Sequence, residues 1–178
     1  ILASVLVTLC LSGFLTVGCS QASKKARHLQ RAEAQFEAGD FDRAEIEYMH
    51  VLRLDRTNQV ALRQLGFMAF EQGRVIRAYA LLNDARRADP DNLEVRIKLA
   101  TMQLAGGQGL EARDEAIWLL TQQPTNEAAL MLLVDSSVST NHLRDAAQQL
   151  ARLQPVAGQT AGWHLAQGAL HLRQRELP

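Results

Sequence analysis

The chain has 178 residues, of which 19 are basic and 19 are acidic, so its formal net charge is zero. Hydrophobic residues make up 47% of the chain, aromatic residues 5%, and there are two cysteines. Zero net charge excludes a protein that binds duplex DNA by neutralising phosphates, because such a protein needs a surplus of Lys and Arg. The apolar content excludes a disordered chain, and two cysteines cannot hold a multi-disulfide fold. The length fits one ordinary domain or a short array of repeats.

The first 17 residues form an uncharged apolar run, ILASVLVTLCLSGFLTV, which lies near the lower length limit for a membrane-spanning helix. The small residues Gly18-Cys19-Ser20 follow it, and the first charged residue is Lys24. An apolar segment that ends in small residues is typical of a secretory signal and its processing site. We therefore expect a signal segment at residues 1–18 and a tether at 19–24. Because the chain starts with Ile and lacks a basic region before the run, we expect that the natural chain begins further upstream.

The four residues Thr16-Val17-Gly18-Cys19 resemble the lipobox of bacterial lipoproteins, although Thr16 stands where that motif usually has Leu. The resemblance implies that the signal is cut before Cys19 and that Cys19 carries a lipid anchor, in which several acyl chains give durable attachment. Ser20 is not the Asp that retains such proteins in the inner membrane, so the resemblance favours the periplasmic face of the outer membrane. Two alternatives remain open. The run could be an uncleaved signal anchor, with the following basic residues keeping the carboxyl side in the cytoplasm, or a buried core helix.

A repeat of 34 residues runs through the rest of the chain. Gly39, Gly73 and Gly107 are 34 residues apart, and small residues recur in phase with them. The eighth position of each repeat is Ala32, Gly66, Ala100, Val134 and Gly168, and the twentieth position is Ala44, Ala78, Ala112 and Ala146. The last position is Asn58, Asn92, Asn126 and Thr160.

This pattern resembles that of the tetratricopeptide repeat (TPR) family, in which each repeat is an antiparallel pair of helices. The resemblance implies an all-α superhelical solenoid of helix pairs, preceded by the apolar signal or anchor segment. It places repeats at 25–58, 59–92, 93–126 and 127–160, the last of them degenerate, and a partial fifth repeat at 161–178. Apolar residues at helical spacing predict helices near 26–38, 42–55, 60–72, 75–88, 93–105, 110–122, 127–139, 143–153 and 161–174. Because the fifth repeat lacks its second helix, we expect the natural chain to continue.

Each recurring position has a physical reason. Small residues at the eighth and twentieth positions allow the two helices of a repeat to approach closely. Glycine suits the left-handed backbone conformation that ends a helix, and we expect Asn141 to take this role in the fourth repeat. Asp40 and the recurring Asn are expected to cap the helices that follow them. Pro90 and Pro124 are expected to stop the helices before them.

The first and fourth repeats depart from the pattern. His28 and Arg31 stand where the second repeat has Leu62 and Leu65, and polar residues can remain hydrated there because a terminal repeat has no neighbour on its outer side. In the fourth repeat, we expect Asp135-Ser136-Ser137 to interrupt the first helix and Pro155 to end the second helix early.

No set of residues in the sequence indicates catalysis or cofactor binding. His164 and His171 could share a helix face, but no acidic or cysteine partner stands at metal-ligand spacing. Gly106-Gly107-Gln108-Gly109 lacks the Lys and Ser or Thr of a phosphate-binding loop, and its place in a turn explains it. Ser136 and Ser137 have no G-x-S-x-G context. We expect no enzyme activity, no cofactor, no metal, no nucleic acid and no small-molecule substrate.

In the TPR family, the first helices of successive repeats line a groove that binds proteins or peptides. Carried onto this chain, the resemblance predicts a groove with an apolar floor and a more acidic amino end. The predicted partner-binding residues are Phe36, Arg63, Phe67, Phe70, Ile97, Thr101, Leu104, Met131 and Asp135. The alternative for Phe36 and Phe70 is that they only pack between helices.

These features together favour a membrane-anchored TPR scaffold in the bacterial cell envelope. Such a scaffold would hold protein partners in an assembly, secretion or polysaccharide-export machinery. Two alternatives differ from it: the repeats could be the amino-terminal arm of a longer enzyme whose catalytic domain follows residue 178, or a cytoplasmic TPR domain on a signal anchor. The complete reading frame tests the first alternative, and protease protection in spheroplasts tests the second.

Overall fold

The computed structural model describes residues 21–176, and every regular element in this range is an α-helix. The predicted signal segment at residues 1–18 and the predicted lipid attachment at Cys19 lie outside the described residues. Between residues 21 and 176, no helix is both long enough and apolar enough to cross a lipid bilayer. The chain divides into two compact units between Asp89 and Pro90.

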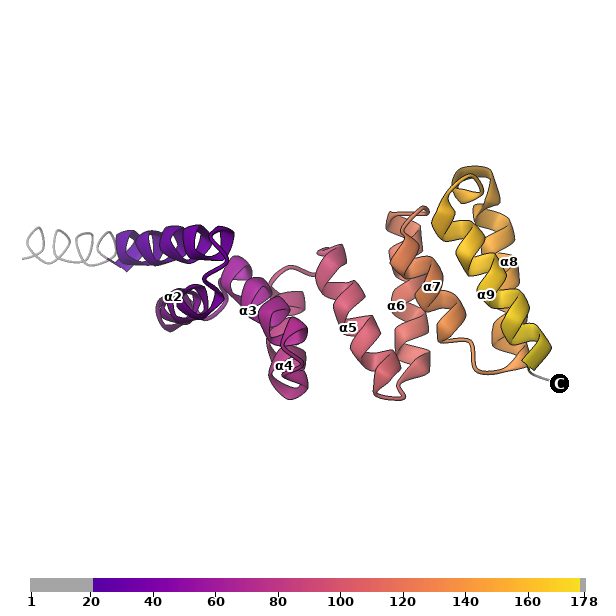
Figure 1. Ribbon diagram of the computed structural model, residues 1–178, viewed down its shortest axis with the longest axis horizontal. Helices are drawn as coiled ribbons and strands as arrows, with labels where there is room; N and C mark the ends of the chain where they lie inside the picture. Colours follow the sequence, from indigo (N-terminus) through magenta and orange to yellow (C-terminus); the bar gives the residue numbers. More distant parts are fainter. Residues whose placement is uncertain (1–20, 177–178) are drawn as a thin grey trace, which may run out of the picture. The chain divides into compact units, whose positions relative to one another are not determined.

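The first unit is built from two antiparallel pairs of helices (Figure 1). A helix at residues 21–37 is followed by α2 (Phe41–Leu54), α3 (Gln59–Glu71) and α4 (Val75–Ala88). α3 packs against both α2 and α4. A buried core joins these helices; it contains Ala32, Ala44, Tyr48, Val51, Ala61, Leu65 and Met68.

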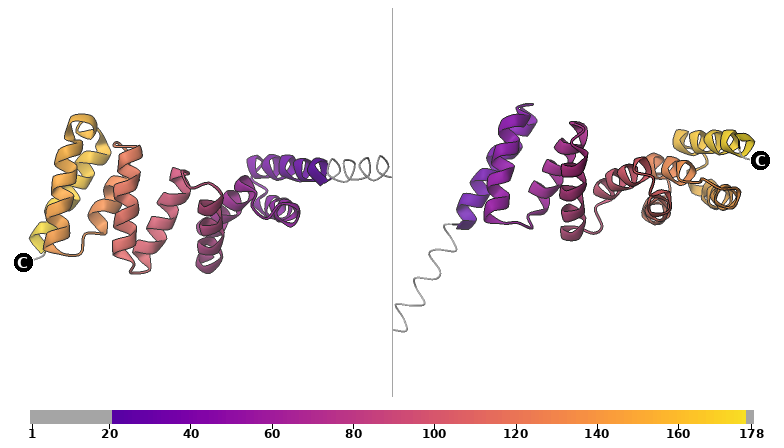
Figure 2. Two further views of the ribbon diagram at one scale, coloured as in Figure 1. Left: turned by 180° about the vertical axis from the view of Figure 1, so that it is seen from behind. Right: turned by 90° about the horizontal axis from the view of Figure 1, so that it is seen from below.

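The second unit contains five helices in the part of it that the structure describes (Figure 2). They are α5 (Leu93–Ala105), α6 (Gly109–Gln122), α7 (Glu127–Asp135), α8 (Thr140–Ala157) and α9 (Ala161–Glu176). α6 packs against α5 and α7, and α9 packs against α7 and α8. The buried core of this unit contains Ala100, Ala116, Leu119, Leu120, Ala129, Leu130, Leu132, Leu133, Val134, Leu143, Ala146, Leu150, Ala166 and Leu170.

Small residues lie where paired helices approach each other, as the repeat pattern predicts. The alanines at the eighth and twentieth positions are completely buried: Ala32, Ala44, Ala78, Ala100, Ala112 and Ala146. At Gly66 a Cβ atom would lie only 2.7 Å from Cδ2 of Leu82, which shows that this position has no room for a side chain. The prediction of close helix approach is confirmed at these positions but not at Gly168, where a Cβ atom would meet nothing within 4 Å.

The predicted turn and cap residues are largely confirmed. Gly39, Gly73 and Gly107 have φ angles of 76°, 69° and 80°, in the left-handed region that favours glycine. Helices α3, α5 and α7 start after asparagines whose side chains accept hydrogen bonds from the backbone of the first turn: Asn58 from Ala61, Asn92 from Val95 and Asn126 from Ala129. Thr160 accepts in the same way from the backbone N–H of Trp163, at 3.2 Å. The Asp40 carboxylate accepts from Arg43 N at 3.3 Å.

The prediction for Asn141 was wrong. Asn141 lies in the first turn of α8, and no residue other than glycine has a positive φ among the described residues. The turn before α8 is closed by hydroxyl groups instead. Ser137 Oγ donates to the carbonyl of Leu133 at 2.8 Å and accepts from the guanidinium of Arg113, also at 2.8 Å. Arg113 is buried, and it also donates to Asp145, so it ties this turn to α6 and α8.

The interruption of the fourth repeat was predicted correctly, because α7 ends at Asp135. The prediction that Pro155 ends the following helix was wrong, since α8 continues through Pro155 to Ala157. Proline has no backbone N–H, so Pro155 cannot donate the helical hydrogen bond to the carbonyl of Ala151, four residues earlier. Pro155 and Ala151 are both exposed, so water can satisfy the carbonyl that the proline leaves unpaired. At the amino end, the first described helix already includes residues 21–25, whereas the sequence pattern placed its start near residue 26.

Candidate protein-binding surface

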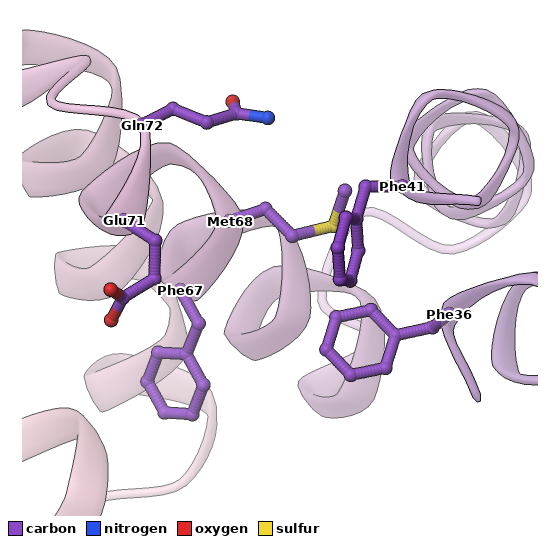
Figure 3. A pocket seen from close by; sticks show the side chains of 6 residues that line it. All are labelled: Phe36, Phe41, Phe67, Met68, Glu71 and Gln72. Carbon is purple, nitrogen blue, oxygen red and sulfur yellow. The ribbon is translucent and has the colours of Figure 1, made fainter. Parts of the chain in front are cut away.

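The first unit has an apolar pocket lined by residues of its first three helices (Figure 3). Its volume is about 190 Å³. The lining residues are Phe36, Phe41, Phe67, Met68, Glu71 and Gln72, and we call this site the aromatic pocket. It has the character of a site for an apolar side chain, because most of its lining is aromatic or aliphatic.

A tight turn brings two of the aromatic side chains together. Phe36 lies at the end of the first helix and Phe41 at the start of α2, and Gly39 supplies the left-handed residue between them. Their rings are in edge-to-face contact, with centroids 5.3 Å apart and an interplanar angle of 70°. Phe41 nevertheless keeps 48% of its surface exposed.

Helix α3 supplies the other side of the pocket. In Figure 3 the side chain of Met68 points towards the ring of Phe41. The ring of Phe67 lies apart from these two side chains and borders another part of the pocket. Met68 is anchored in the core of the first unit, whereas Phe67 is only half-buried. The pocket thus combines fixed side chains with side chains that a partner could cover.

Charged residues stand close to this packed cluster. The hydroxyl of Tyr48, in the same core as Phe36 and Met68, has its pKa raised to about 12 by burial and by the negative charge of Glu33. Arg63 opposes this increase in the pKa, and Glu37 adds to it. Glu33 and Glu37 are exposed, lie one turn apart on the helix that carries Phe36, and make no ion pair with any described residue.

In the first unit, two of the predicted partner-binding residues line the pocket. These are Phe36 and Phe67, the first of which also packs against the core. Arg63 lies one turn before Phe67 on α3 and is half-buried. Phe70 is also half-buried, but it does not line the pocket.

In the second unit, the predicted residues are mostly engaged within the fold. Ile97, Leu104 and Met131 pack against the buried core. Thr101 is exposed, and its hydroxyl donates to the carbonyl of Ile97 at 2.9 Å. The carboxylate of Asp135 accepts from the guanidinium of Arg173 at 3.0 Å, which joins α7 to α9.

Sequence reasoning missed Phe41, Met68 and Gln72 as lining residues. The repeat pattern assigns Phe41 to a second helix, and second helices do not line the groove of the family. A signal for Phe41 was present, however: a second phenylalanine follows Phe36 across a turn of glycine and aspartate. Met68 has helical spacing typical of a core residue, and the structure places it in both the core and the pocket.

Three of the five histidines make ring contacts with other side chains. His28 stacks on His50 with ring centroids 4.9 Å apart, and its Nδ1 lies 2.5 Å from Oε2 of Glu47. His164 contacts the ring of Trp163 edge to face. Within the part of the chain that the structure describes, no group of three or more His, Cys, Asp and Glu is placed to hold a metal ion.

Comparison with known proteins shows which fold the chain has. Residues 69–117, which run from the end of α3 into α6, match the family described as tetratricopeptide repeat. A tetratricopeptide repeat protein from Parabacteroides merdae has a TM-score of 0.70 to this chain at 18% identity, covering 83% of this chain and 59% of its own. The chain has the TPR fold. YrrB, a TPR protein with an unusual peptide-binding site, has a TM-score of 0.68 at 17% identity, covering 83% of this TPR chain and 76% of its own.

The chain also has a relative in sequence. It is 33% identical over 106 residues to cellulose synthase operon protein C of Pseudomonas fluorescens (strain SBW25). The aligned part is 60% of this chain and 8% of that protein, so the chain spans a small part of the relative's length.

Proposed function

We propose that this chain is a TPR scaffold that binds protein partners, and that the aromatic pocket receives an apolar side chain of a partner. The observation that carries the proposal is the open cavity of about 190 Å³ bordered by Phe36, Phe41 and Phe67. Aromatic side chains around a concave site are typical of the few residues that supply most of the energy of a protein interface. The peptide-binding site of YrrB, which shares the fold, supports the same kind of function. The proposed role involves binding alone and no catalytic step.

We further propose that the scaffold is attached to the bacterial envelope by a lipid on Cys19. The lipobox-like sequence that ends at Cys19 supports this location. The similarity to cellulose synthase operon protein C supports a place beside machinery for polysaccharide synthesis or export. Protein partners in the same compartment are then the expected ligands.

Site-specific photo-crosslinking tests the binding function. The photoreactive residue p-benzoylphenylalanine replaces Phe67 in the aromatic pocket, and in a control protein it replaces Ile76, which is 89% exposed on α4 and does not line the pocket. In cells of the source bacterium, ultraviolet light is expected to yield discrete protein adducts from position 67 and none of the same size from position 76. Absence of adducts from position 67, or identical adducts from both positions, would contradict the proposal.

Metabolic labelling with palmitate tests the anchor. Cys19→Ala is expected to abolish incorporation of the label and to release or trap the protein, because only the thiol of Cys19 stands at the predicted processing site. Cys10→Ala is the matched control, since Cys10 lies within the apolar run, and labelling is expected to be unchanged in it. Unchanged palmitate incorporation in Cys19→Ala would refute lipid attachment at this residue.

A further inference from the structure

We propose that the partner segment recognised by the aromatic pocket is a basic one, in which a large apolar residue is accompanied by Lys or Arg that Glu33 and Glu37 bind. This inference rests on the proposed function, because it gives the chemistry of the ligand for the same pocket. It commits to a peptide segment of a protein partner, with the apolar side chain in the pocket and the cation on the side of the first described helix.

The size and the exposed aromatic rings of the pocket indicate a large apolar side chain as its ligand. The cavity has room for one large side chain and is bordered by Phe41, which keeps 48% of its surface exposed. Covering this ring and the half-buried ring of Phe67 removes apolar surface from water, which favours binding in proportion to the area buried. Met68 and Phe36 are held by the core, so the pocket is largely formed before a partner arrives.

The carboxylates of the first unit differ in whether they have an ion-pair partner within the fold. Glu45 pairs with Arg74 and Arg77, Glu47 lies against His28, and Asp55 pairs with Lys25 at 2.8 Å. Arg31 lies 3.6 Å from the second oxygen of Glu47, so each of these three carboxylates has a Lys or Arg partner in the fold. Glu33 and Glu37 are exposed and make no ion pair with any described residue.

The position of the two glutamates connects them with the pocket. Glu33 and Glu37 are four residues apart, so they lie on one face of their helix, and Phe36 is three residues from Glu33 on the same side. Glu71, on α3, lines the pocket itself. Arg63 acts with the opposite sign on the same Tyr48 hydroxyl as the two glutamates. Two carboxylates, Glu33 and Glu37, thus stand against Arg63 among the charges that act on this hydroxyl, so the local field favours a basic ligand.

Selection from a displayed peptide library tests this chemistry. A phage library of random 12-residue peptides is selected on the immobilised full chain in about 0.1 M salt, where charges within about 10 Å still interact. The parent protein is compared with Phe67→Ser and with the double variant Glu33→Gln/Glu37→Gln. Ile76→Ser and Glu111→Gln are the matched controls, because they remove an exposed apolar residue and an exposed carboxylate away from the pocket.

The expected result has two parts. The parent protein and both controls enrich peptides in which a large apolar residue stands within three or four positions of Lys or Arg, and Phe67→Ser loses this enrichment. For a synthetic copy of the most enriched peptide, measured by fluorescence anisotropy, Glu33→Gln/Glu37→Gln weakens binding about two- to tenfold, as for two exposed ion pairs, and the effect disappears in 1 M salt.

Two different outcomes overturn the inference. Enrichment of acidic or uncharged apolar peptides that is still lost in Phe67→Ser leaves the proposed binding function standing and refutes the basic ligand. No enrichment by the parent protein, or enrichment that Phe67→Ser does not change, refutes both the pocket as a binding site and the ligand assigned to it. Circular dichroism of each variant shows whether it is folded, and Phe67→Leu replaces Phe67→Ser if the latter is not.

Discussion

Packing at single positions determines how closely the paired helices lie. At Gly66 the backbone of α3 approaches α4 so closely that a Cβ atom would stand 2.7 Å from Leu82 Cδ2. At Gly168 in α9 a Cβ atom would meet nothing within 4 Å. Both glycines occupy the eighth position of their repeats, so the same residue type meets opposite steric conditions at the two sites.

This difference predicts opposite effects of the same substitution. Gly66→Ala is expected to lower the free energy of unfolding by about 1–3 kcal/mol, because Leu82 and the helices must move apart. Gly168→Ala is expected to raise it by about 0.5–1 kcal/mol, because alanine favours the helix. Urea denaturation followed by circular dichroism measures both. Equal effects of the two substitutions would show that close packing at Gly66 is not what restricts that position.

The ion pairs of Glu45 predict a pH dependence of stability. The Arg74 guanidinium, which donates to Glu45 at 2.6 and 3.2 Å, lowers the pKa of this carboxyl; burial opposes the shift and Arg77 supports it. Because the pKa in the folded state lies below the ordinary value of 4.5, the ion pairs stabilise the fold above pH 4.5. Their contribution is lost as the pH falls through the lowered pKa.

The corresponding variant is Glu45→Gln, which keeps the shape of the side chain. Its Tm is expected to lie below that of the parent protein at pH 7, and the difference is expected to shrink as the pH falls from about 4.5 to 3. Differential scanning calorimetry across this range measures the difference, with Glu111→Gln as a control for a general loss of negative charge. A Tm difference that stays constant with pH would contradict the assignment to these ion pairs.

At the scale of the helices, most of the fold could be predicted from the sequence. Small residues, glycine turns and asparagine caps all act locally, so the 34-residue pattern places most helix ends within about two residues. The exceptions depend on contacts that the pattern does not contain. Arg113 lies 24 residues before Ser137 but donates to its hydroxyl, and this contact helps to close a turn for which the pattern predicted a left-handed Asn141. Pro155 stays inside α8 because its environment is exposed.

The caps of the second helices predict a stabilising substitution. Helix α6 starts after Gln108, which makes no side-chain cap hydrogen bond, and its φ and ψ of −88° and 59° are close to those of the cap residue Asp40, −84° and 72°. Gln108→Asp is therefore expected to raise the free energy of unfolding by about 0.5–1 kcal/mol, through a hydrogen bond to the first turn and a favourable interaction with the helix dipole.

Urea denaturation tests this substitution against two others at the same position. Gln108→Asn retains the cap without the charge and is expected to give a smaller gain, while Gln108→Ala is expected to give none. A gain for Gln108→Ala as large as that for Gln108→Asp would mean that the cap is not the cause.

At the scale of the whole molecule, the candidate site was less predictable than the fold. The family resemblance pointed to Phe36 and Phe67, which line the aromatic pocket, but it also named residues such as Ile97 and Met131, which pack against a core. Repeat position alone does not distinguish these cases. Whether an apolar side chain faces a cavity or a core depends on neighbouring side chains that differ from repeat to repeat.

The two cores predict that destabilisation stays within one unit. Leu133→Ala removes a completely buried side chain from the core of the second unit and is expected to cost about 2–5 kcal/mol. Because the first unit has its own buried core, amide hydrogen exchange is expected to accelerate mainly in residues 90–176. Leu65→Ala is the matched variant for the first unit, with faster exchange expected in residues 21–89. Equal acceleration in both units for either variant would show that they unfold as one.

The turn at residues 136–139 shows that two different chemistries can close the turn between the helices of a repeat. At Gly39, Gly73 and Gly107 the turn depends on backbone freedom, because most side chains would strain a positive φ. Between α7 and α8 the turn depends instead on hydroxyl groups, since Ser136 and Ser137 both donate to the carbonyl of Leu133. A single repeat can thus do without the turn glycine while Val134 and Ala146 keep the same 34-residue spacing.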